Sequence, residues 1–409
     1  MEQRLKIVIV DGSFKTTPFI NRLAMGLAGK HRVFILGFNE ELKYPIPGVH
    51  YVSLGSNQNK VRFVDTALGT LLRSRAFNLL IPTLKKLLQG ERHALQQQNL
   101  TLALTKITPD VIHVQWPSTL RWFEPVLTKQ NIPVVLSQRG FHNNVRPFVD
   151  PDNHNYLKTW YPKLAGFHSV SKAISINGDK IWSAPEKTDR VVYTGLPIDN
   201  FDFNTTYTKT TPLQLLSIGR PHWKKGYAYA LRACKLLQER GIAFHYTIIG
   251  GSGDEELQYL LHDLELQDQV TLENRLPQNT VFKQMQEASL LLMTSVEEGL
   301  PNVAVEAMAI GLPVLSTDCG GVPELIDHGK NGWLVPTRDP GAMAASIFDF
   351  INLTRSHIET VRTAARKKVA QQHNESLMIE GMVGLYKTVL EEARKSKDEI
   401  LPSAALRSE

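Results

Sequence analysis

Residues 295–316 read SVEEGLPNVAVEAMAIGLPVLS. The apolar run Leu290–Met293 precedes this stretch and predicts a buried strand, and a helix over Asn302–Ile310 follows the Gly-Leu-Pro turn. Glu298 then lies in the loop at the carboxyl edge of a sheet, and Glu306 lies about one turn into the helix. Because the first N–H groups of a helix have no intrahelical partner, the stretch predicts an anion-binding site.

The same strand–helix pattern recurs along the whole chain. Short apolar or β-branched runs alternate with amphipathic helical patterns such as Ala228–Arg240 and Thr280–Ala288. Such an alternation is typical of parallel sheets covered on both faces, and it predicts an α/β protein with two Rossmann-like, doubly wound sheets. The predicted strands are Lys6–Val10, Arg32–Leu36, Val49–Leu54, Val111–Val114, Pro133–Ser137, Phe167–Val170, Val191–Tyr193, Leu213–Ile218, Phe244–Ile249, Val270–Leu272, Leu290–Met293, Pro313–Ser316 and Gly332–Val335.

Chain length also predicts two domains, because 409 residues exceed what one hydrophobic core usually organises. The polar segment Asn200–Pro212 marks the boundary between residues 1–200 and 201–375. We expect residues 376–396 to form a C-terminal helix that packs back toward the first domain. Residues 397–409 are expected to form a mobile tail. We expect the two sheets to face a deep interdomain cleft, where ligands of open α/β sheets bind.

Charge is divided unevenly between the two halves. Residues 1–200 contain 25 Lys and Arg against 14 Asp and Glu, a net charge of +11, whereas residues 201–409 carry −5. The basic half either meets an anionic partner, such as lipid head groups, a phosphorylated acceptor or nucleic acid, or presents a solvated basic surface. No nucleic-acid-binding module is recognisable, so we expect no nucleic-acid partner.

Cysteine usage and apolar runs bear on the compartment. The two cysteines, Cys234 and Cys319, show no metal or redox spacing, which favours a reducing environment. The opening MEQRLKIVIVDG is typical of a first strand and not of a signal peptide, and no apolar run approaches the roughly 20 residues that span a bilayer. We expect a cytoplasmic protein, at most peripheral on the inner face of the membrane.

Further motifs give the opening stretch a specific resemblance. Glu298 and Glu306, with the Glu-Ala-Met-Ala-x-Gly-x-Pro-Val that begins at Glu306, resemble the E-x7-E signature of glycosyltransferase family 4, a retaining family of the GT-B fold. The resemblance extends to Gly219-Arg220 with Lys225-Gly226 and to Gly320-Gly321-Val-Pro-Glu. It covers residues 190–390 well and the first half loosely, and it implies a metal-independent enzyme without a cofactor.

By this resemblance, Arg220 and Lys225 bind the diphosphate of a nucleotide-sugar donor. A guanidinium and an ammonium suit this task, because negative charge accumulates on the leaving nucleoside diphosphate. Glu306 resembles the glutamate that accepts hydrogen bonds from the ribose hydroxyls, and Glu298 the one nearest the donor sugar. The remaining residues assigned to the donor are Gly299, Leu300, Pro301, Asn302, Gly250, Gly251, Gly253, Gly12 and Arg275.

The first half departs from the family pattern. Members usually carry a Gly-Gly loop after the first strand, where this chain has only Gly12, and many place a histidine where this chain has Arg139. His142 follows three residues later, and His113 ends another predicted strand. We assign Arg139 and His142 to the catalytic set together with Glu298, Arg220 and Lys225, with His113 as a further candidate for the contact with the reacting sugar.

The segment Lys60–Arg92 combines seven Lys and Arg with two acidic residues and ten Val and Leu at helical spacing. A basic amphipathic segment of this kind can lie on anionic lipid. A helix that covers a sheet has the same pattern, so both interpretations remain open. We hypothesise a weak contact with anionic membranes.

The resemblance favours a retaining hexosyltransferase that moves a sugar from a nucleotide diphosphate, UDP first and GDP second, to a glycan or glycolipid hydroxyl in cell-surface polysaccharide or lipopolysaccharide-type biosynthesis. The alternative is a non-catalytic sugar-nucleotide-binding or scaffolding subunit, favoured by the departures in the first half. A dinucleotide-dependent oxidoreductase is disfavoured, because no strand is followed by G-x-G-x-x-G with an acidic residue about 20 positions later.

Overall fold

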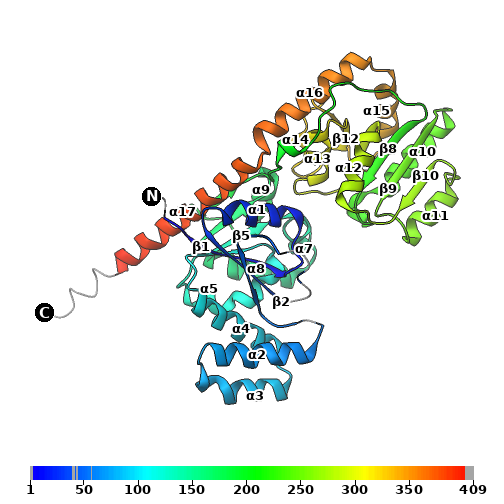
Figure 1. Ribbon diagram of the computed structural model, residues 1–409. Helices are drawn as coiled ribbons and strands as arrows, with labels where there is room; N and C mark the ends of the chain where they lie inside the picture. The colour runs from blue at the N-terminus through cyan, green and yellow to red at the C-terminus, as the bar shows by residue number, and fades with distance from the viewer. Residues whose placement is uncertain (1–2, 39–41, 43–44, 57, 401–409) are drawn as a thin grey trace. The chain divides into compact units, whose positions relative to one another are not determined.

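The computed structural model describes residues 3–38, 42, 45–56 and 58–400, and these form two compact units (Figure 1). The first unit comprises the chain up to Val170, Ile174–Gly195 and the helix that begins at Glu375. The second comprises Ser171–Ala173 and Leu196–Asn374. The division thus follows Gly195, whereas the sequence placed the boundary after residue 200.

A seven-stranded parallel sheet forms the centre of the first unit, in the order β3-β2-β1-β4-β5-β6-β7. In register, Ile9 of β1 pairs with Ile35 on one side and His113 on the other. The strands are β1 (Lys6–Ser13), β2 (Arg32–Phe38), β3 (Val49–Ser53), β4 (Val111–Val114), β5 (Val134–Gln138), β6 (Gly166–Ser169) and β7 (Asp189–Val191).

The second unit contains a six-stranded parallel sheet in the order β10-β9-β8-β11-β12-β13. Two of its strands, β11 and β12, are buried at every position, as expected for strands that helices cover on both faces. The strands are β8 (Leu213–Ile218), β9 (Phe244–Ile249), β10 (Val270–Glu273), β11 (Leu290–Met293), β12 (Val314–Thr317) and β13 (Trp333–Val335).

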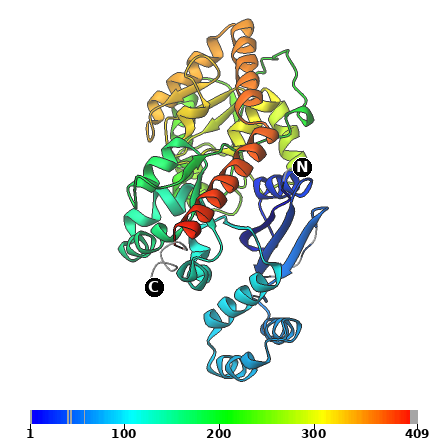
Figure 2. The same cartoon turned by 90° about the vertical axis from the view of Figure 1, so that its left-hand side faces the viewer.

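Helices cover both faces of the first sheet. On one face, buried side chains of α1 and α17 pack against β1 and β2, and on the other, α4, α5 and α8 contribute to a separate cluster. Figure 2 shows the long α17 alongside the strands of this unit. The helices are α1 (Pro18–Ala28), α2 (Lys60–Arg73), α3 (Leu80–Gln89), α4 (Arg92–Ile107), α5 (Glu124–Lys129), α6 (Gly140–Asn144), α7 (Arg146–Val149), α8 (Pro151–Trp160), α9 (Lys172–Asp179) and α17 (Glu375–Ile400), with 3-10 turns η1 (Phe77–Leu79), η2 (Pro117–Phe123) and η3 (Tyr161–Lys163).

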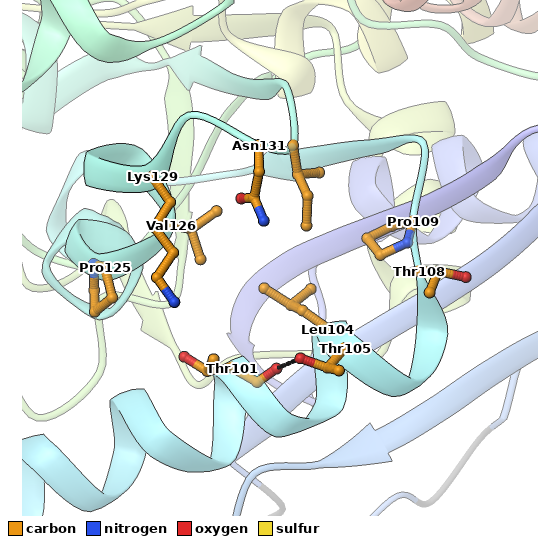
Figure 3. A pocket seen from close by; sticks show the side chains of 10 residues that line it. Thr101, Leu104, Thr105, Thr108, Pro109, Pro125, Val126, Lys129 and Asn131 are labelled. Atoms are coloured by element: carbon orange, nitrogen blue, oxygen red, sulfur yellow. Dashed lines mark hydrogen bonds between the residues drawn. The ribbon is translucent and has the colours of Figure 1, made fainter.

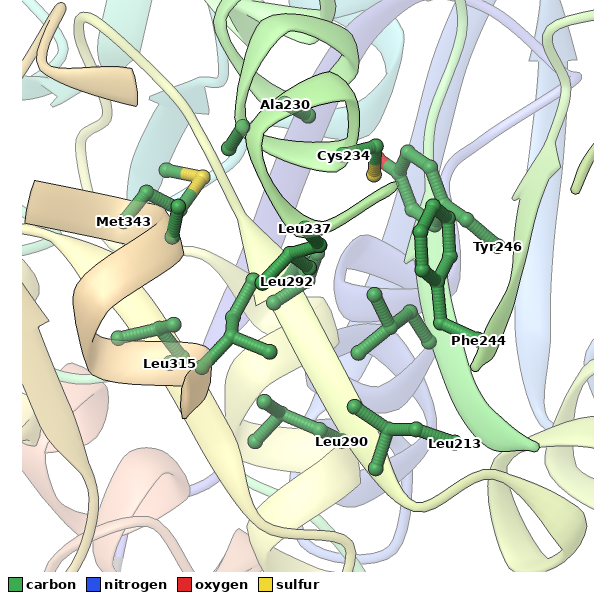
Figure 4. Close-up of a cluster of buried hydrophobic side chains, with 14 of the residues drawn as sticks. Leu213, Ala230, Cys234, Leu237, Phe244, Tyr246, Leu290, Leu292, Leu315 and Met343 are labelled. Atoms are coloured by element: carbon green, nitrogen blue, oxygen red, sulfur yellow. The ribbon is translucent and has the colours of Figure 1, made fainter. Parts of the chain in front are cut away.

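The second sheet is covered in the same way. Leu290 and Leu292 of β11 meet Leu237 of α10 and Met343 of α15 in the cluster of Figure 4, whereas α13 packs on the opposite face. Helix α16 contributes side chains to both clusters. The helices are α10 (Tyr227–Glu239), α11 (Glu255–Asp263), α12 (Gln278–Glu287), α13 (Asn302–Ile310), α14 (Val322–Leu325), α15 (Pro340–Asn352) and α16 (Arg355–Gln372), with η4 (Ile198–Asn200) and η5 (Trp223–Lys225).

Each predicted strand overlaps a strand of the structure, so the expectation of two doubly wound parallel sheets is confirmed. The strand predicted at Val191–Tyr193 is shifted, because β7 begins at the polar residue Asp189. The carboxylate of Asp189 accepts hydrogen bonds from Ser169 and Ser175, which stabilises this residue in an edge strand.

Two helical segments predicted from the sequence have different bounds in the structure. Lys60–Arg92 forms two helices, α2 and α3, because the chain turns at Arg75, whose φ is 51°. The C-terminal helix extends to Ile400, and residues 401–409 of the predicted tail lie outside the described residues. Within the described part of the chain, no helix is both long and apolar enough to cross a membrane.

A substitution in the core of the second unit tests the packing described above. Leu290→Ala is expected to lower the free energy of unfolding by about 2–5 kcal/mol, because it leaves a cavity at a side chain with no exposed surface. Tyr259→Ala, at a side chain that is 66% exposed in the same unit, serves as the control and is expected to change it by less than about 0.5 kcal/mol. Urea unfolding of both variants measures the difference, and equal losses would contradict the packing described.

Candidate functional site

A topological switch point lies between β8 and β11 of the second sheet. The chain leaves β8 toward α10 on one face and leaves β11 toward α13 on the other. Because the loops diverge there, the carboxyl edge beside such a point is where open α/β sheets bind ligands. Most of the residues predicted to bind the donor lie in segments 219–226 and 294–302, which follow these two strands.

The structure brings Lys225 and Glu298 together at this edge. Lys225 Nζ lies 2.7 Å from Glu298 Oε1, and the same oxygen accepts a hydrogen bond of 2.9 Å from Ser295 Oγ. Glu298 is only 7% exposed, whereas the Lys225 side chain keeps 20% of its surface accessible. A buried carboxylate needs such partners, since an uncompensated charge in this position would be strongly destabilising.

The pKa of Glu298 reflects the same environment. Burial alone raises this pKa, but the positive charges of Lys225 and Lys224, with hydrogen bonds from Lys225 and Ser295, lower it below its ordinary value. Glu298 is therefore ionised at neutral pH, and the Lys225 ammonium carries a matching charge. Ser295 was not singled out from the sequence, although its position directly after a buried strand is a usable signal.

Backbone contacts hold the two loops against each other. Thr294 Oγ1 donates to the Lys225 carbonyl oxygen at 2.8 Å, and Val296 N donates to the Lys224 carbonyl oxygen at 2.7 Å. Gly226 directly precedes helix α10 with a φ of 66°, and a β-carbon there would overlap the Thr294 carbonyl oxygen. The absence of a side chain at Gly226 thus permits the approach that places Lys225 beside Glu298.

Two adjacent glycines that follow β12, Gly320 and Gly321, contact the loop that carries Glu298. Gly321 N donates to the Gly299 carbonyl oxygen at 3.1 Å. A β-carbon at Gly320, whose φ is 52°, would overlap the Glu298 carbonyl oxygen, and one at Gly321 would overlap that of Gly299. The Gly-Gly pair noted in the sequence therefore packs directly against the backbone of the glutamate loop.

Several cations surround the turn after β8. Burial and the charges of Arg220, Lys224 and Lys225 lower the pKa of His222. Arg220 is exposed, whereas Lys224 and Lys225 are half-buried. Three cations near one imidazole give this turn a positive potential that suits a polyanionic ligand.

Glu306 and the residues before it belong to α13. Pro301 precedes the helix, Asn302 is its first residue, and Glu306 lies half-buried one turn further on. Gly299 is buried and Leu300 half-buried in the preceding loop. These residues occupy the same strand–loop–helix connection as Glu298, so the local structure predicted around the opening stretch is present.

The glycine turn after β9 lies next to the turn after β8. Gly250 has a φ of 93°, and a β-carbon there would lie 2.9 Å from the Gly219 carbonyl oxygen. Gly251 is buried, whereas Gly253 and Arg275 are exposed. Gly250 is thus required for close approach of two backbones, and Arg275, which the sequence assigned to the donor, lies exposed after β10.

In the first unit, the carboxyl edge carries a cluster of mostly half-buried polar and aromatic side chains at the switch point between β1 and β4. Asp11, at a register shift in β1, accepts a hydrogen bond from Trp116 Nε1. Arg139 donates to Gln115 Oε1 at 3.0 Å, and its guanidinium carbon lies 4.2 Å from the ring centre of Phe19 and 5.9 Å from that of Trp116. Burial lowers the pKa of Arg139 to about 9.

The other predicted residues of this edge have different surroundings. Gly12 adopts a φ of 91° beside Trp122 of η2. His142 is half-buried in α6, with its ring centre 5.9 Å from that of Trp116. Asp11 and Trp116 were missed by the sequence analysis, although both lie directly at the ends of predicted strands.

His113 belongs to a buried chain of hydrogen bonds. Its Nδ1 lies 2.7 Å from Tyr386 Oη and its Nε2 lies 2.8 Å from Ser137 Oγ. Ser137 Oγ in turn lies 2.8 Å from His168 Nδ1, and His168 Nε2 lies 2.9 Å from the Val192 carbonyl oxygen. Burial lowers the pKa of both histidines, to about 3 for His168. With both ring nitrogens engaged, His113 has a structural role in joining α17 to the sheet.

A pocket of about 350 Å³ lies elsewhere in the first unit, between α4 and the chain around α5 (Figure 3). Leu104 and Val126 line it, and Thr105 Oγ1 donates to the Thr101 carbonyl oxygen at its rim. None of the predicted site residues lines this pocket. In the described residues, no group of three or more His, Cys, Asp or Glu side chains is arranged to hold a metal ion.

A family comparison concerns the second unit. Residues 199–368 match the family model described as "Glycosyl transferases group 1". The chain is 33% identical over 217 residues to the putative colanic acid biosynthesis glycosyltransferase WcaL of Salmonella typhimurium, covering 51% of this chain and 53% of that protein. It is 32% identical over 231 residues to the amylovoran biosynthesis glycosyltransferase AmsK of Erwinia amylovora, covering 53% and 56%. The chain thus spans about half the length of these relatives.

A solved structure extends the likeness to almost the whole chain. Anabaena Alr3699/HepE, solved in complex with UDP and glucose, covers 94% of this chain and 100% of its own with a TM-score of 0.68 and 17% identity. At this identity the likeness concerns the fold alone. The GT-B fold expected from the sequence is confirmed.

The contact between Gly226 and Thr294 predicts unequal effects of two alanine substitutions. Gly241→Ala, with a similar φ of 70° and no atom near its β-carbon, is expected to cost about 1 kcal/mol of unfolding free energy. Gly226→Ala is expected to cost about 3 kcal/mol or more, because the β-carbon also displaces the Thr294 loop. Chemical unfolding of both variants tests this, and an equal cost would exclude the steric role of Gly226.

A second prediction concerns pH. Burial raises the pKa of Asp11 from 3.8 to about 6, against the hydrogen bond from Trp116 and the charge of Arg139, which lower it. Between these values the native state binds more protons than the unfolded state, so the free energy of unfolding falls as pH rises from about 4 to 6. Asp11→Asn, whose carbonyl can still accept from Trp116, is expected to reduce this fall. Unfolding at a series of pH values measures it, and an unchanged slope would rule out Asp11 as its source.

Proposed function

We propose, from the group 1 glycosyl transferase match over residues 199–368, that this chain is a glycosyltransferase. It transfers a sugar from a nucleoside diphosphate sugar to a hydroxyl of a glycan or glycolipid acceptor, in cell-surface polysaccharide or lipopolysaccharide-type biosynthesis. The observation that carries this proposal is the Lys225–Glu298 ion pair, held at the switch point of the second sheet among further cations.

In this proposal the cations act on the leaving group. As the bond between the sugar and the diphosphate breaks, negative charge grows on the phosphate oxygens, and Lys225 and Arg220 stabilise that charge. Lys225 is positioned before the donor arrives, because Glu298 and the Thr294 loop fix it. Pre-positioned charges need little reorganisation during the reaction, which makes their contribution large. Lys225 and Arg220 together also provide a diphosphate site that needs no metal.

The two glutamates have separate roles in the proposal. Glu306 accepts hydrogen bonds from the vicinal ribose hydroxyls, a task that suits the two oxygens of one carboxylate. Glu298 lies near the donor sugar and, being ionised, favours positive charge on the anomeric carbon. The acceptor oxygen bonds to that carbon on the face from which the phosphate leaves, and its proton passes to the departing phosphate oxygen. The anomeric configuration is then retained.

The donor and acceptor classes follow from the relatives. HepE was solved with UDP and glucose, which supports UDP as the first choice of nucleotide, with GDP second. WcaL and AmsK are named for the biosynthesis of colanic acid and amylovoran, which supports a polysaccharide or its lipid-linked precursor as the acceptor. Cys234 and Cys319 are buried and unpaired, which supports a reducing, cytoplasmic location.

A second candidate function is a sugar-nucleotide-binding subunit without transferase activity. It is favoured by the surroundings of Arg139, whose guanidinium is already engaged with Gln115, Phe19 and Trp116 inside the first unit. Such a protein would bind the donor through the second unit and leave it intact. Donor turnover therefore distinguishes the two candidates.

A panel of UDP-, GDP- and ADP-sugars tests the donor site. A donor that binds only the folded state is expected to raise the melting temperature. Lys225→Ala is expected to lower the turnover of that donor by about 100-fold or more, because it removes the positive charge that stabilises the leaving diphosphate. Lys224→Ala, the adjacent cation that makes no ion pair with Glu298, serves as the matched control and is expected to lose far less.

Each possible outcome has a distinct meaning. A melting shift with slow donor hydrolysis that Glu298→Ala and Lys225→Ala abolish supports the transferase. A shift without any turnover, across a range of glycan acceptors, supports the binding subunit. No shift with any nucleotide sugar would contradict both.

A further inference from the structure

Helix α3 is oriented with its polar side toward the protein. Thr83 is fully buried and its hydroxyl accepts a hydrogen bond of 2.6 Å from Gln98 Nε2 on α4. Lys86 Nζ donates to Gln98 Oε1 at 3.1 Å. The opposite side of α3 carries Ile81 and Leu88, which are 79% and 90% exposed. A helix that covers a soluble domain normally has the reverse arrangement, with its apolar stripe inward.

Exposed apolar side chains are concentrated in this part of the molecule. Among the described residues, 15 large apolar side chains are exposed, and seven of them belong to α2, η1 and α3. Exposed apolar side chains gathered in one part of a molecule are typical of an interaction site. We call these seven the hairpin surface: Val61, Leu72, Phe77, Leu80, Ile81, Leu84 and Leu88.

The hairpin surface lies at one extremity of the first unit. In Figures 1 and 2, α2 and α3 lie together beyond α4, on the side away from the strands. Both helices pack against α4 and against each other. The surface is thus presented by a compact group of helices that projects from the sheet.

Basic residues accompany these apolar side chains. Residues 60–92 contain seven Lys and Arg and only two acidic residues, Asp65 and Glu91. Lys60, Arg62 and Lys85 are exposed. Apolar side chains flanked by cations match the interface of an anionic bilayer, where the former enter the acyl boundary and the latter meet phosphate head groups.

We propose that the hairpin surface docks on a lipid surface that carries anionic head groups. A second copy of this chain is a poorer occupant, because it would bring the exposed cations Lys60, Arg62 and Lys85 against the same cations of its partner. A neutral apolar partner would leave the cations without a counterpart. The inference concerns the first unit alone and does not depend on the proposed donor site.

Flotation of the full chain with vesicles tests this surface. Binding is expected to vesicles of phosphatidylcholine and phosphatidylglycerol in equal parts, and not to phosphatidylcholine alone. Raising the salt concentration is expected to weaken it, because the attraction between lysines and head groups is screened. The double variant Ile81→Glu/Leu88→Glu is expected to lower the partition coefficient by about tenfold or more, since two apolar side chains no longer enter the lipid.

A matched control separates this surface from a general effect of charge. Val149→Glu/Ile176→Glu makes the same change at two side chains of the first unit that are 71% and 60% exposed, and it is expected to bind vesicles nearly as the parent does. Both double variants should keep the parent melting temperature and its shift with donor, which shows that folding and the second unit are unaffected.

Three results would overturn the proposal. The first is no flotation of the parent chain with anionic vesicles at low salt. The second is an equal loss in the two double variants. The third is a concentration-dependent dimer that Ile81→Glu/Leu88→Glu abolishes while vesicles remain unbound, which would identify the hairpin surface as a contact between copies of this chain.

Discussion

The ion pair between Lys225 and Glu298 requires that two loops from different strands be held at one distance. A carboxylate as buried as that of Glu298 is stable only with a cation and a hydroxyl in place, so any separation of the loops would leave a charge without a partner. Hydrogen bonds from the Thr294 hydroxyl and the Val296 amide to carbonyl oxygens of the Lys225 loop, with glycines at positions 226 and 320, fix that distance. The ion pair therefore depends on the positions of the two backbone loops. These loops also fix where the helices that follow them, α10 and α13, begin.

The carboxyl edge of the first sheet has a different arrangement of charged side chains. Its polar side chains contact one another and nearby rings: Arg139 contacts Gln115 and two aromatic rings, and Asp11 accepts a hydrogen bond from Trp116. Desolvation brings the pKa of this carboxyl to about 6 and that of the guanidinium to about 9. One unit thus presents an exposed cation, Arg220, at its switch point, whereas the other holds the half-buried Arg139 between a glutamine and two aromatic rings.

Sequence periodicity predicted the fold well because parallel strands buried on both faces leave unbroken apolar runs, as at Leu290–Met293. It also located the loop of Glu298, since a strand, a Gly-Pro turn and a helix follow one another directly. Contacts between distant segments could not be predicted: nothing local indicates that Thr294 binds the Lys225 carbonyl oxygen. Likewise, periodicity marks the apolar stripe of α3 but not the side toward which it turns, because Gln98 on another helix decides that.

Helix α17 completes the hydrophobic core of the first unit, although it is the last described element of the chain. Its Leu385 and Tyr386 are fully buried against the cluster that contains Ile7 and Ile9 of β1. Leu196–Asn374 lies between these contributions and forms nearly the whole of the other unit. During synthesis on the ribosome, the sequence of the second unit is therefore complete before that of the first unit. The strands of the first unit are synthesised early, but one of their apolar faces is covered only when α17 has been made.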